Sequence, residues 1–125
     1  EPALLRGQWV LCDRFSDASF AYQGGGRGLA YNKLVLLETW VHEATNPDLT
    51  FLFDLPTEIA EVRMSHQGRE KDRFEAEQAD FHKRVKEAYL QRAKEADQRI
   101  VVLEAQKEIA VLQEAIRQTV LKRFL

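Results

Sequence analysis

Residues 11 to 28 read Leu-Cys-Asp-Arg-Phe-Ser-Asp-Ala-Ser-Phe-Ala-Tyr-Gln-Gly-Gly-Gly-Arg-Gly. The stretch places an acid, a base, hydroxyls and aromatic rings at the end of an apolar run, Gln8 to Asp13, that has the character of a buried parallel strand. In α/β folds, ligands bind beyond the carboxyl ends of such strands. The sequence therefore predicts a binding site that begins at Asp13.

Two further apolar runs, Asp48 to Asp54 and Arg99 to Leu103, predict strands. Helical segments are expected between them, around Thr57 to Ser65 and around Glu75 to Ala96. Because so much chain separates the two strands, they cannot form a hairpin and should run parallel. The alternation of strands and helices predicts an α/β fold with a three-layer arrangement around a parallel sheet.

The predicted helices differ in how much apolar surface they carry. The long helix has an apolar stripe at three-to-four spacing, and so does the last helix, which indicates packing faces. Their members are Phe81, Val85, Ala88, Tyr89, Arg92 and Ala93 in the first and Ile109, Leu112, Ile116 and Val120 in the second. By contrast, apolar residues between Leu34 and Val41 cover more than one helical face, which favours an additional contact with another subunit.

Composition restricts the class of protein. The 125 residues are 45% hydrophobic, enough for one domain or part of one, and the net charge of −2 gives no general attraction to nucleic acid or anionic membranes. Cys12 has no second cysteine to pair with, and its spacing to the three histidines is not that of a zinc site. No apolar run reaches the ~18 residues of a membrane span, and no secretory signal is present, so we expect a cytoplasmic protein.

The segment from Asp13 to Gly28 resembles the signature of bacterial thymidylate kinases. Asp-Arg-Phe, a serine, Ala-Tyr-Gln and Gly-Gly-Gly-Arg-Gly follow one another in the same order and at the same spacing. The similarity extends from Trp9 through Asp48 to Pro56 and on to the last helix. It implies a nucleoside monophosphate kinase of the P-loop NTPase type that transfers a phosphoryl group from ATP to dTMP, giving dTDP, with Mg²⁺ and as a homodimer.

The resemblance also assigns roles to residues near the first predicted strand. Arg14 is expected to hold the phosphate of dTMP, and Asp13 to orient that arginine or reach the magnesium shell; capping of the following turn is the alternative for Asp13. Ser19 and Tyr22 lie three residues apart, so on a helix they should face the same side. The resemblance implies that this helix lines the thymine pocket; the alternative is that Tyr22 is a core aromatic residue and Ser19 a surface residue. Gln23 would add an amide for the base or sugar.

A second charged cluster, approximately residues 63 to 75, resembles the mobile lid of these kinases. Its arginines would close over the phosphates of ATP and take part in catalysis, with Arg73 the first candidate and Arg63 and Arg69 the next. A solvated linker is the alternative interpretation of such a charge run. Ser65 and Gln67 stand where many relatives have arginines, so the catalytic arginine is less well assigned than the dTMP side.

No Gly-x-x-x-x-Gly-Lys-Ser/Thr motif occurs in the 125 residues, and the first residue is Glu1. We therefore interpret residues 1 to 125 as the C-terminal part of a single kinase domain, with the P-loop strand missing, and expect the chain to be inactive and unstable alone. In the family, that strand lies between the strands matching Gln8 to Asp13 and Asp48 to Asp54. The alternatives are a non-catalytic dTMP-binding remnant and a kinase for another nucleoside monophosphate.

Overall fold

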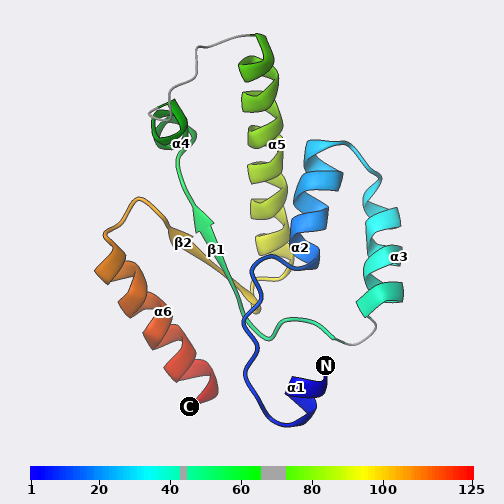
Figure 1. Ribbon diagram of the computed structural model, residues 1–125, viewed down its shortest axis with the longest axis vertical. Coiled ribbons are helices and arrows are strands. Elements are labelled where there is room, and N and C mark those ends of the chain that lie inside the picture. Colours follow the sequence, from blue (N-terminus) through cyan, green and yellow to red (C-terminus); the bar gives the residue numbers. More distant parts are fainter. Residues whose placement is uncertain (43–44, 66–72) are drawn as a thin grey trace.

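The computed structural model describes residues 1–42, 45–65 and 73–125 (Figure 1). Along the chain these residues form α1 (Pro2–Leu5), α2 (Ser16–Ser19), η1 (Phe20–Gly26), α3 (Tyr31–His42), β1 (Thr50–Asp54), α4 (Thr57–Ser65), α5 (Arg73–Glu95), β2 (Ile100–Glu104) and α6 (Ile109–Phe124). The π-helix η1 continues directly from α2. Across these described ranges, no helix is both long and apolar enough to cross a membrane.

The two strands β1 and β2 pair in parallel, as the sequence predicts. Their register runs from Thr50 opposite Ile100 to Asp54 opposite Glu104. The connection between them contains α4 and α5, which is the long crossover that a parallel pair requires. The strand positions and both connecting helices agree with the expected ranges to within two residues, so the α/β prediction is confirmed.

The strand predicted from Gln8 to Asp13 is not formed, and this prediction is wrong. The segment runs as exposed loop: Leu11 is 99% exposed, and the Trp9 ring packs edge-on against Phe124 at 5.4 Å between centroids. A strand is held by hydrogen bonds to its neighbours. In the described part of the chain the sheet consists of β1 and β2, so residues 8–13 have no strand beside them to pair with.

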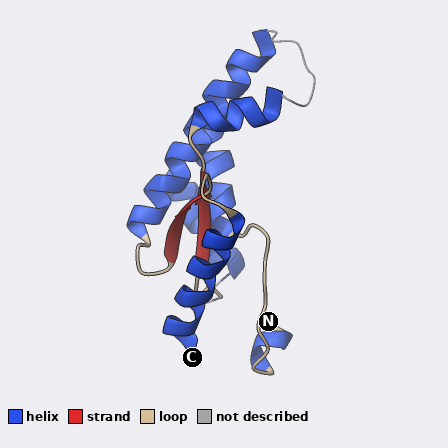
Figure 2. Ribbon diagram, turned by 90° about the vertical axis from the view of Figure 1, so that its left-hand side faces the viewer, coloured by secondary structure: helices blue, strands red, loops and turns tan. Residues whose placement is uncertain are grey.

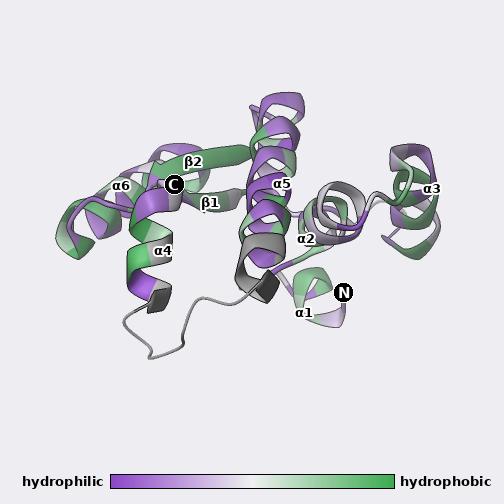
Figure 3. Cartoon of the chain, turned by 90° about the horizontal axis from the view of Figure 1, so that it is seen from above, coloured by the Kyte–Doolittle hydropathy of each residue, from purple (hydrophilic) through white to green (hydrophobic). Residues whose placement is uncertain are grey.

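The helices form layers on both sides of the sheet. Seen from above, the elements follow one another as α6, the β1–β2 sheet, α5, α2 with η1, and finally α3 (Figure 3). The side view shows the two strands lying together with α6 in front of them (Figure 2). Helix α5 contacts both strands and η1, so it connects the sheet to the segment predicted to bind ligand.

Helix α5 and η1 pack closely because glycines remove side chains from their interface. A Cβ on Gly25 would lie 2.5 Å from the Cβ of Ala88 and 2.8 Å from the carbonyl oxygen of Arg84. A Cβ on Gly26 would lie 2.4 Å from the Phe81 ring. The glycine run of the sequence signature is therefore a packing surface in this structure, and the predicted packing stripe of α5 faces it.

The buried apolar core lies mainly between η1, α5 and β2. Among the described residues its members are Phe20, Ala21, Leu34, Val85, Ala93, Ile100 and Leu103. The predicted packing face of α6 is only half-buried at Leu112, Ile116 and Val120, and Ile109 is exposed. The chain has 9932 Å² of accessible surface, whereas a compact folded monomer of 14.5 kDa exposes about 6900 Å².

Helix α3 carries the broad apolar surface that the sequence indicates. Leu34 is 3% exposed and packs inward, while Leu36, Leu37 and Val41 are exposed and Trp40 is 81% exposed. One face of α3 is therefore used for packing within the chain and the others are open. The predicted contact of this helix with another subunit stays a prediction.

Candidate functional site

Arg14 has a backbone conformation that is uncommon for a residue with a side chain. Its φ is +69°, in the left-handed region, which costs roughly 1–2 kcal/mol for residues other than glycine. The Cys12 thiol donates a hydrogen bond to the Arg14 carbonyl oxygen at 3.1 Å. Strained backbone of this kind concentrates at functional sites, where the surrounding structure holds it in place.

The structure brings two of the sequence-predicted residues, Arg14 and Tyr22, together. The Arg14 guanidinium carbon lies 5.1 Å from the centre of the Tyr22 ring, and Nη2 donates a long hydrogen bond of 3.4 Å to Tyr22 Oη. Arg14 is exposed and pairs with no carboxylate among the described residues. Most of its five N–H donors are therefore available to an anion.

Tyr22 is itself held by α5. Its ring lies 6.1 Å from that of Phe81 and 6.3 Å from that of Tyr89, measured between centroids. Burial is the main cause that raises the pKa of the Tyr89 hydroxyl, so this group stays neutral at physiological pH. Two aromatic residues of α5 thus fix the ring beside which Arg14 lies.

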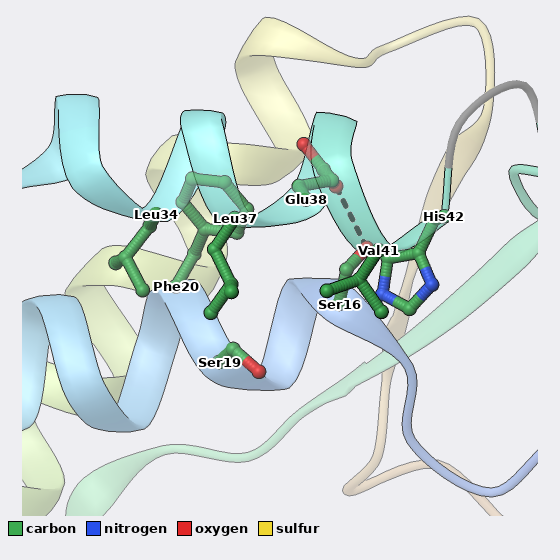
Figure 4. Close-up of a pocket in the computed structure, with 8 residues that line it drawn as sticks. All are labelled: Ser16, Ser19, Phe20, Leu34, Leu37, Glu38, Val41 and His42. Atoms are coloured by element: carbon green, nitrogen blue, oxygen red, sulfur yellow. Dashed lines mark hydrogen bonds between the residues drawn. The ribbon is translucent and has the colours of Figure 1, made fainter.

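The sequence predicts that Ser19 and Tyr22 face the same side, but in the structure the two residues have different surroundings. Ser19 lines a pocket of about 220 Å³ between α2 and α3, together with Leu34, Leu37 and Val41 (Figure 4). Tyr22 instead faces α5. The i→i+5 hydrogen bonding of η1 widens each turn, so residues three apart no longer lie one above the other.

The other residues that the sequence predicts for the site are either exposed or outside the described part of the chain. Asp13 and Gln23 are exposed, next to Arg14 and Tyr22 respectively. Arg63 is exposed on α4. Arg69 lies outside the residues that the structure describes. Arg73 is the first residue of α5, and the structure describes its backbone but not its side chain. The expected lid arginines therefore stay predictions.

A buried acidic residue, Asp17, was missed by the sequence reasoning. It is 5% exposed, and its two carboxylate oxygens accept three hydrogen bonds. Oδ1 accepts from Arg92 Nε at 2.9 Å and from Arg99 Nη2 at 2.8 Å, and Oδ2 accepts from Arg99 Nη1 at 2.8 Å. Burial raises the pKa of Asp17, but the hydrogen bonds and charges of Arg99 and Arg92 outweigh it and hold that pKa below its usual value.

Arg92 extends this cluster toward α3. Its Nη2 donates to Glu38 at 2.7 Å, and its guanidinium lies 4.0 Å from the centre of the Phe20 ring. Burial lowers the pKa of Arg92, but hydrogen bonds to Asp17, Tyr31 and Glu38 more than reverse this, so the guanidinium stays charged. The sequence held one signal for the cluster: an arginine within the apolar stripe of a helix needs a buried carboxylate.

Almost the whole chain is similar to known proteins. Residues 1–116 match the family model described as thymidylate kinase. The thymidylate kinase of Chromobacterium violaceum is 56% identical over 113 residues, covering 90% of this chain and 53% of that protein. That of Cupriavidus metallidurans is 51% identical over 120 residues, covering 96% and 60%. That of Chromohalobacter salexigens is 49% identical over 115 residues, covering 92% and 54%. The chain spans between half and three fifths of the length of these relatives.

Proposed function

Since this chain belongs to the thymidylate kinase family, we propose that it supplies the dTMP-binding side and the lid of an enzyme that transfers a phosphoryl group from ATP to dTMP, giving dTDP. The single observation that carries this proposal is the state of Arg14. Its backbone is strained, its side chain rests against Tyr22, and it has no acidic partner among the residues described. A planar guanidinium in this state suits bidentate binding of a phosphate.

The acceptor pocket is assembled from residues on one continuous helical segment and the loop before it. Arg14 binds the dTMP phosphate and lowers the repulsion between the two nucleotides. Tyr22, fixed by Phe81 and Tyr89, forms an aromatic wall for the nucleoside. Gln23 is exposed next to it and offers an amide to the base or sugar.

Ser19 lies apart from the other residues proposed to bind dTMP. Ser19 lines the pocket between α2 and α3 while Tyr22 packs against α5, so contact with the base requires the base to reach the Ser19 side of α2. The pocket, at about 220 Å³, is smaller than the ~300 Å³ at which ligand pockets usually begin. Ser19 is therefore the weakest member of the proposed dTMP set.

The lid arginines Arg63, Arg69 and Arg73 are proposed to bind the ATP phosphates and stabilise the transferring group. Phosphoryl transfer requires mostly positioning and charge neutralisation, which guanidinium groups provide. Closure over the site also excludes water and limits hydrolysis of ATP. In the sequence, the proposed lid residues run from the last turns of α4 to the first turn of α5.

The described residues near Arg14 offer Mg²⁺ one carboxylate ligand, that of Asp13. The Asp13 carboxylate is exposed and forms no ion pair among the described residues, so it can face the ion directly or through water. Within the same ranges no three His, Cys, Asp or Glu side chains gather as a metal site. Mg²⁺ bound in this way takes most of its ligands from phosphates and water, and it supplies charge neutralisation on the ATP phosphates.

ATP binding and subunit association involve the whole enzyme. The phosphate-cradling Gly-x-x-x-x-Gly-Lys-Ser/Thr loop is not within these 125 residues, so ATP binding by the chain alone is expected to be weak. We also propose a homodimer, with the exposed apolar faces of α3 as a contact surface, and a cytoplasmic location.

The Arg14→Ala variant of an enzyme that contains this segment tests the proposal. Loss of charged hydrogen bonds to phosphate should raise KM for dTMP by about 10-fold to 100-fold and change KM for ATP less than about twofold. Arg117→Ala is the control, because Arg117 is exposed on α6 and pairs with Glu114 at 2.8 Å. Equal increases of both KM values would contradict the role of Arg14.

A further inference from the structure

Asp17 lies within the proposed acceptor segment, but it cannot touch a substrate. It is 5% exposed, and hydrogen bonds from Arg92 and Arg99 occupy both carboxylate oxygens. In sequence it lies three residues after Arg14 and five before Tyr22. A role for Asp17 in the reaction would therefore have to act through the residues around it.

In the cluster around Asp17, the positive and negative charges balance and the buried polar groups are all hydrogen-bonded. Asp17 and Glu38 supply two negative charges, and Arg92 and Arg99 supply two positive ones. Ser16 donates a hydrogen bond to Glu38 at 2.7 Å. No buried side-chain nitrogen or oxygen in the described part of the chain lacks a hydrogen-bond partner. A fully satisfied buried network fixes the elements that it joins in one arrangement.

The elements that meet in this cluster come from distant parts of the sequence. Asp17 is on α2, Glu38 on α3 and Arg92 on α5, while Arg99 directly precedes β2. Arg99 Nη1 also donates to Thr50 Oγ1 on β1 at 2.9 Å. Asp17 thereby connects the start of the acceptor segment to the sheet and to the helix that leads from the proposed lid.

We propose that Asp17 is a positioning residue, which fixes the segment from Arg14 to Tyr22 against α5 and the sheet through Arg92 and Arg99. The ligand of that segment, dTMP, rests on the proposed function. The arrangement matters because Arg14 and Tyr22 lie on either side of Asp17 in the chain and still touch each other. Release of Asp17 frees the first helical turn and separates the phosphate-binding group from the aromatic wall.

The test compares Asp17→Asn with Asp17→Glu, which keeps the charge, and with Asp97→Asn, which removes an exposed carboxylate near the same strand. Amide hydrogen exchange is measured by NMR in an enzyme that contains this segment, and dTMP affinity by calorimetry on the same enzyme. In Asp17→Asn, amides of residues 16–22 should exchange at least about tenfold faster and those of β2 within about twofold of the original rate. Asp17→Glu should give intermediate rates, and Asp97→Asn should match the original chain.

Unchanged exchange in residues 16–22, or equal acceleration in β2, would overturn the positioning role, because the second result is that of general destabilisation. If Asp17→Asn does not fold, Arg99→Lys replaces it: this variant keeps the charge but not the two-pronged contact, and the same local acceleration is expected. The dTMP affinity of Asp17→Asn should fall about tenfold. If the unsubstituted enzyme binds no dTMP, the proposed function fails, while the exchange rates still decide whether Asp17 holds the segment.

Discussion

Arg14 combines a strained backbone with an exposed guanidinium. A substitution that relieves the backbone strain should therefore stabilise the fold, although it removes the group proposed to bind phosphate. Glycine adopts φ of +69° without a Cβ clash, whereas alanine does not. We predict that Arg14→Gly is more stable than Arg14→Ala by about 1 kcal/mol, while both lose dTMP binding. Urea unfolding of the two variants, made in an enzyme that contains this segment, measures the difference. Equal stabilities would mean that the left-handed conformation at this position carries no strain.

Asp17 should also make the stability of the chain dependent on acid. Its folded-state pKa lies below its ordinary value of 3.8, so its ion pairs stabilise the fold above that pH and lose their effect as the pH falls through the folded pKa. We predict that the free energy of unfolding decreases below pH 4 and that this decrease is smaller in Asp17→Asn.

Urea titrations between pH 7 and pH 3, on an enzyme that contains this segment, provide the measurement for Asp17. Two exposed carboxyls also have a lowered pKa: a hydrogen bond from Tyr31 is the first cause for Glu95, and one from Arg117 is the first cause that lowers the pKa of Glu114 to about 2. The difference between the unsubstituted chain and Asp17→Asn isolates Asp17 from both. Parallel curves would show that Asp17 does not titrate as its surroundings indicate.

At the scale of elements, the contact between η1 and α5 depends on the glycine run. Gly25→Ala would place a Cβ 2.5 Å from Ala88 and 2.8 Å from a backbone oxygen, neither of which can rotate away. We predict a loss of about 2 kcal/mol in the free energy of unfolding. Gly24→Ala is the matched control, since its Cβ would lie 2.9 Å from the end of the Leu34 side chain and at an ordinary contact distance of 3.9 Å from the Leu29 carbonyl oxygen. Equal losses in the two variants would contradict the close-packing account.

The elements that the sequence predicts correctly are those whose stabilising partners lie in the same chain. β1 and β2 pair with each other, and α5 contacts both, so local patterns and tertiary contacts agree. The run Gln8–Asp13 has an equally apolar composition, but strand formation needs a neighbour, and composition does not report whether one is present.

The candidate site was predictable where a contiguous motif encodes it. Arg14 and Tyr22 belong to one short signature, and the structure places them in contact. Asp17 was missed because its partners Arg92 and Arg99 are 75 and 82 residues away, and sequence spacing does not show such pairings. The separate surroundings of Ser19 and Tyr22 were missed because a π-helix has no distinct hydrophobic pattern.

The whole molecule exposes about 3000 Å² more surface than a compact chain of its mass. Exposed apolar residues contribute to this on several elements, among them Leu11, Trp40, Phe53 and Ile109. Apolar patches and an unpaired strand edge promote association. We predict that the isolated chain self-associates at micromolar concentration, as measured by sedimentation velocity. A monomer that unfolds in one cooperative thermal transition would contradict this prediction.

The central claim is that residues 13 to 23 bind the phosphate of dTMP. An NMR titration of an isotope-labelled enzyme that contains this segment with dTMP, and separately with thymidine, tests it most directly. The account predicts shifts concentrated in this segment and in the residues of α5 around Phe81, with thymidine at least about tenfold weaker because it lacks the phosphate. Equal binding of both ligands, or no shifts with dTMP, would contradict it.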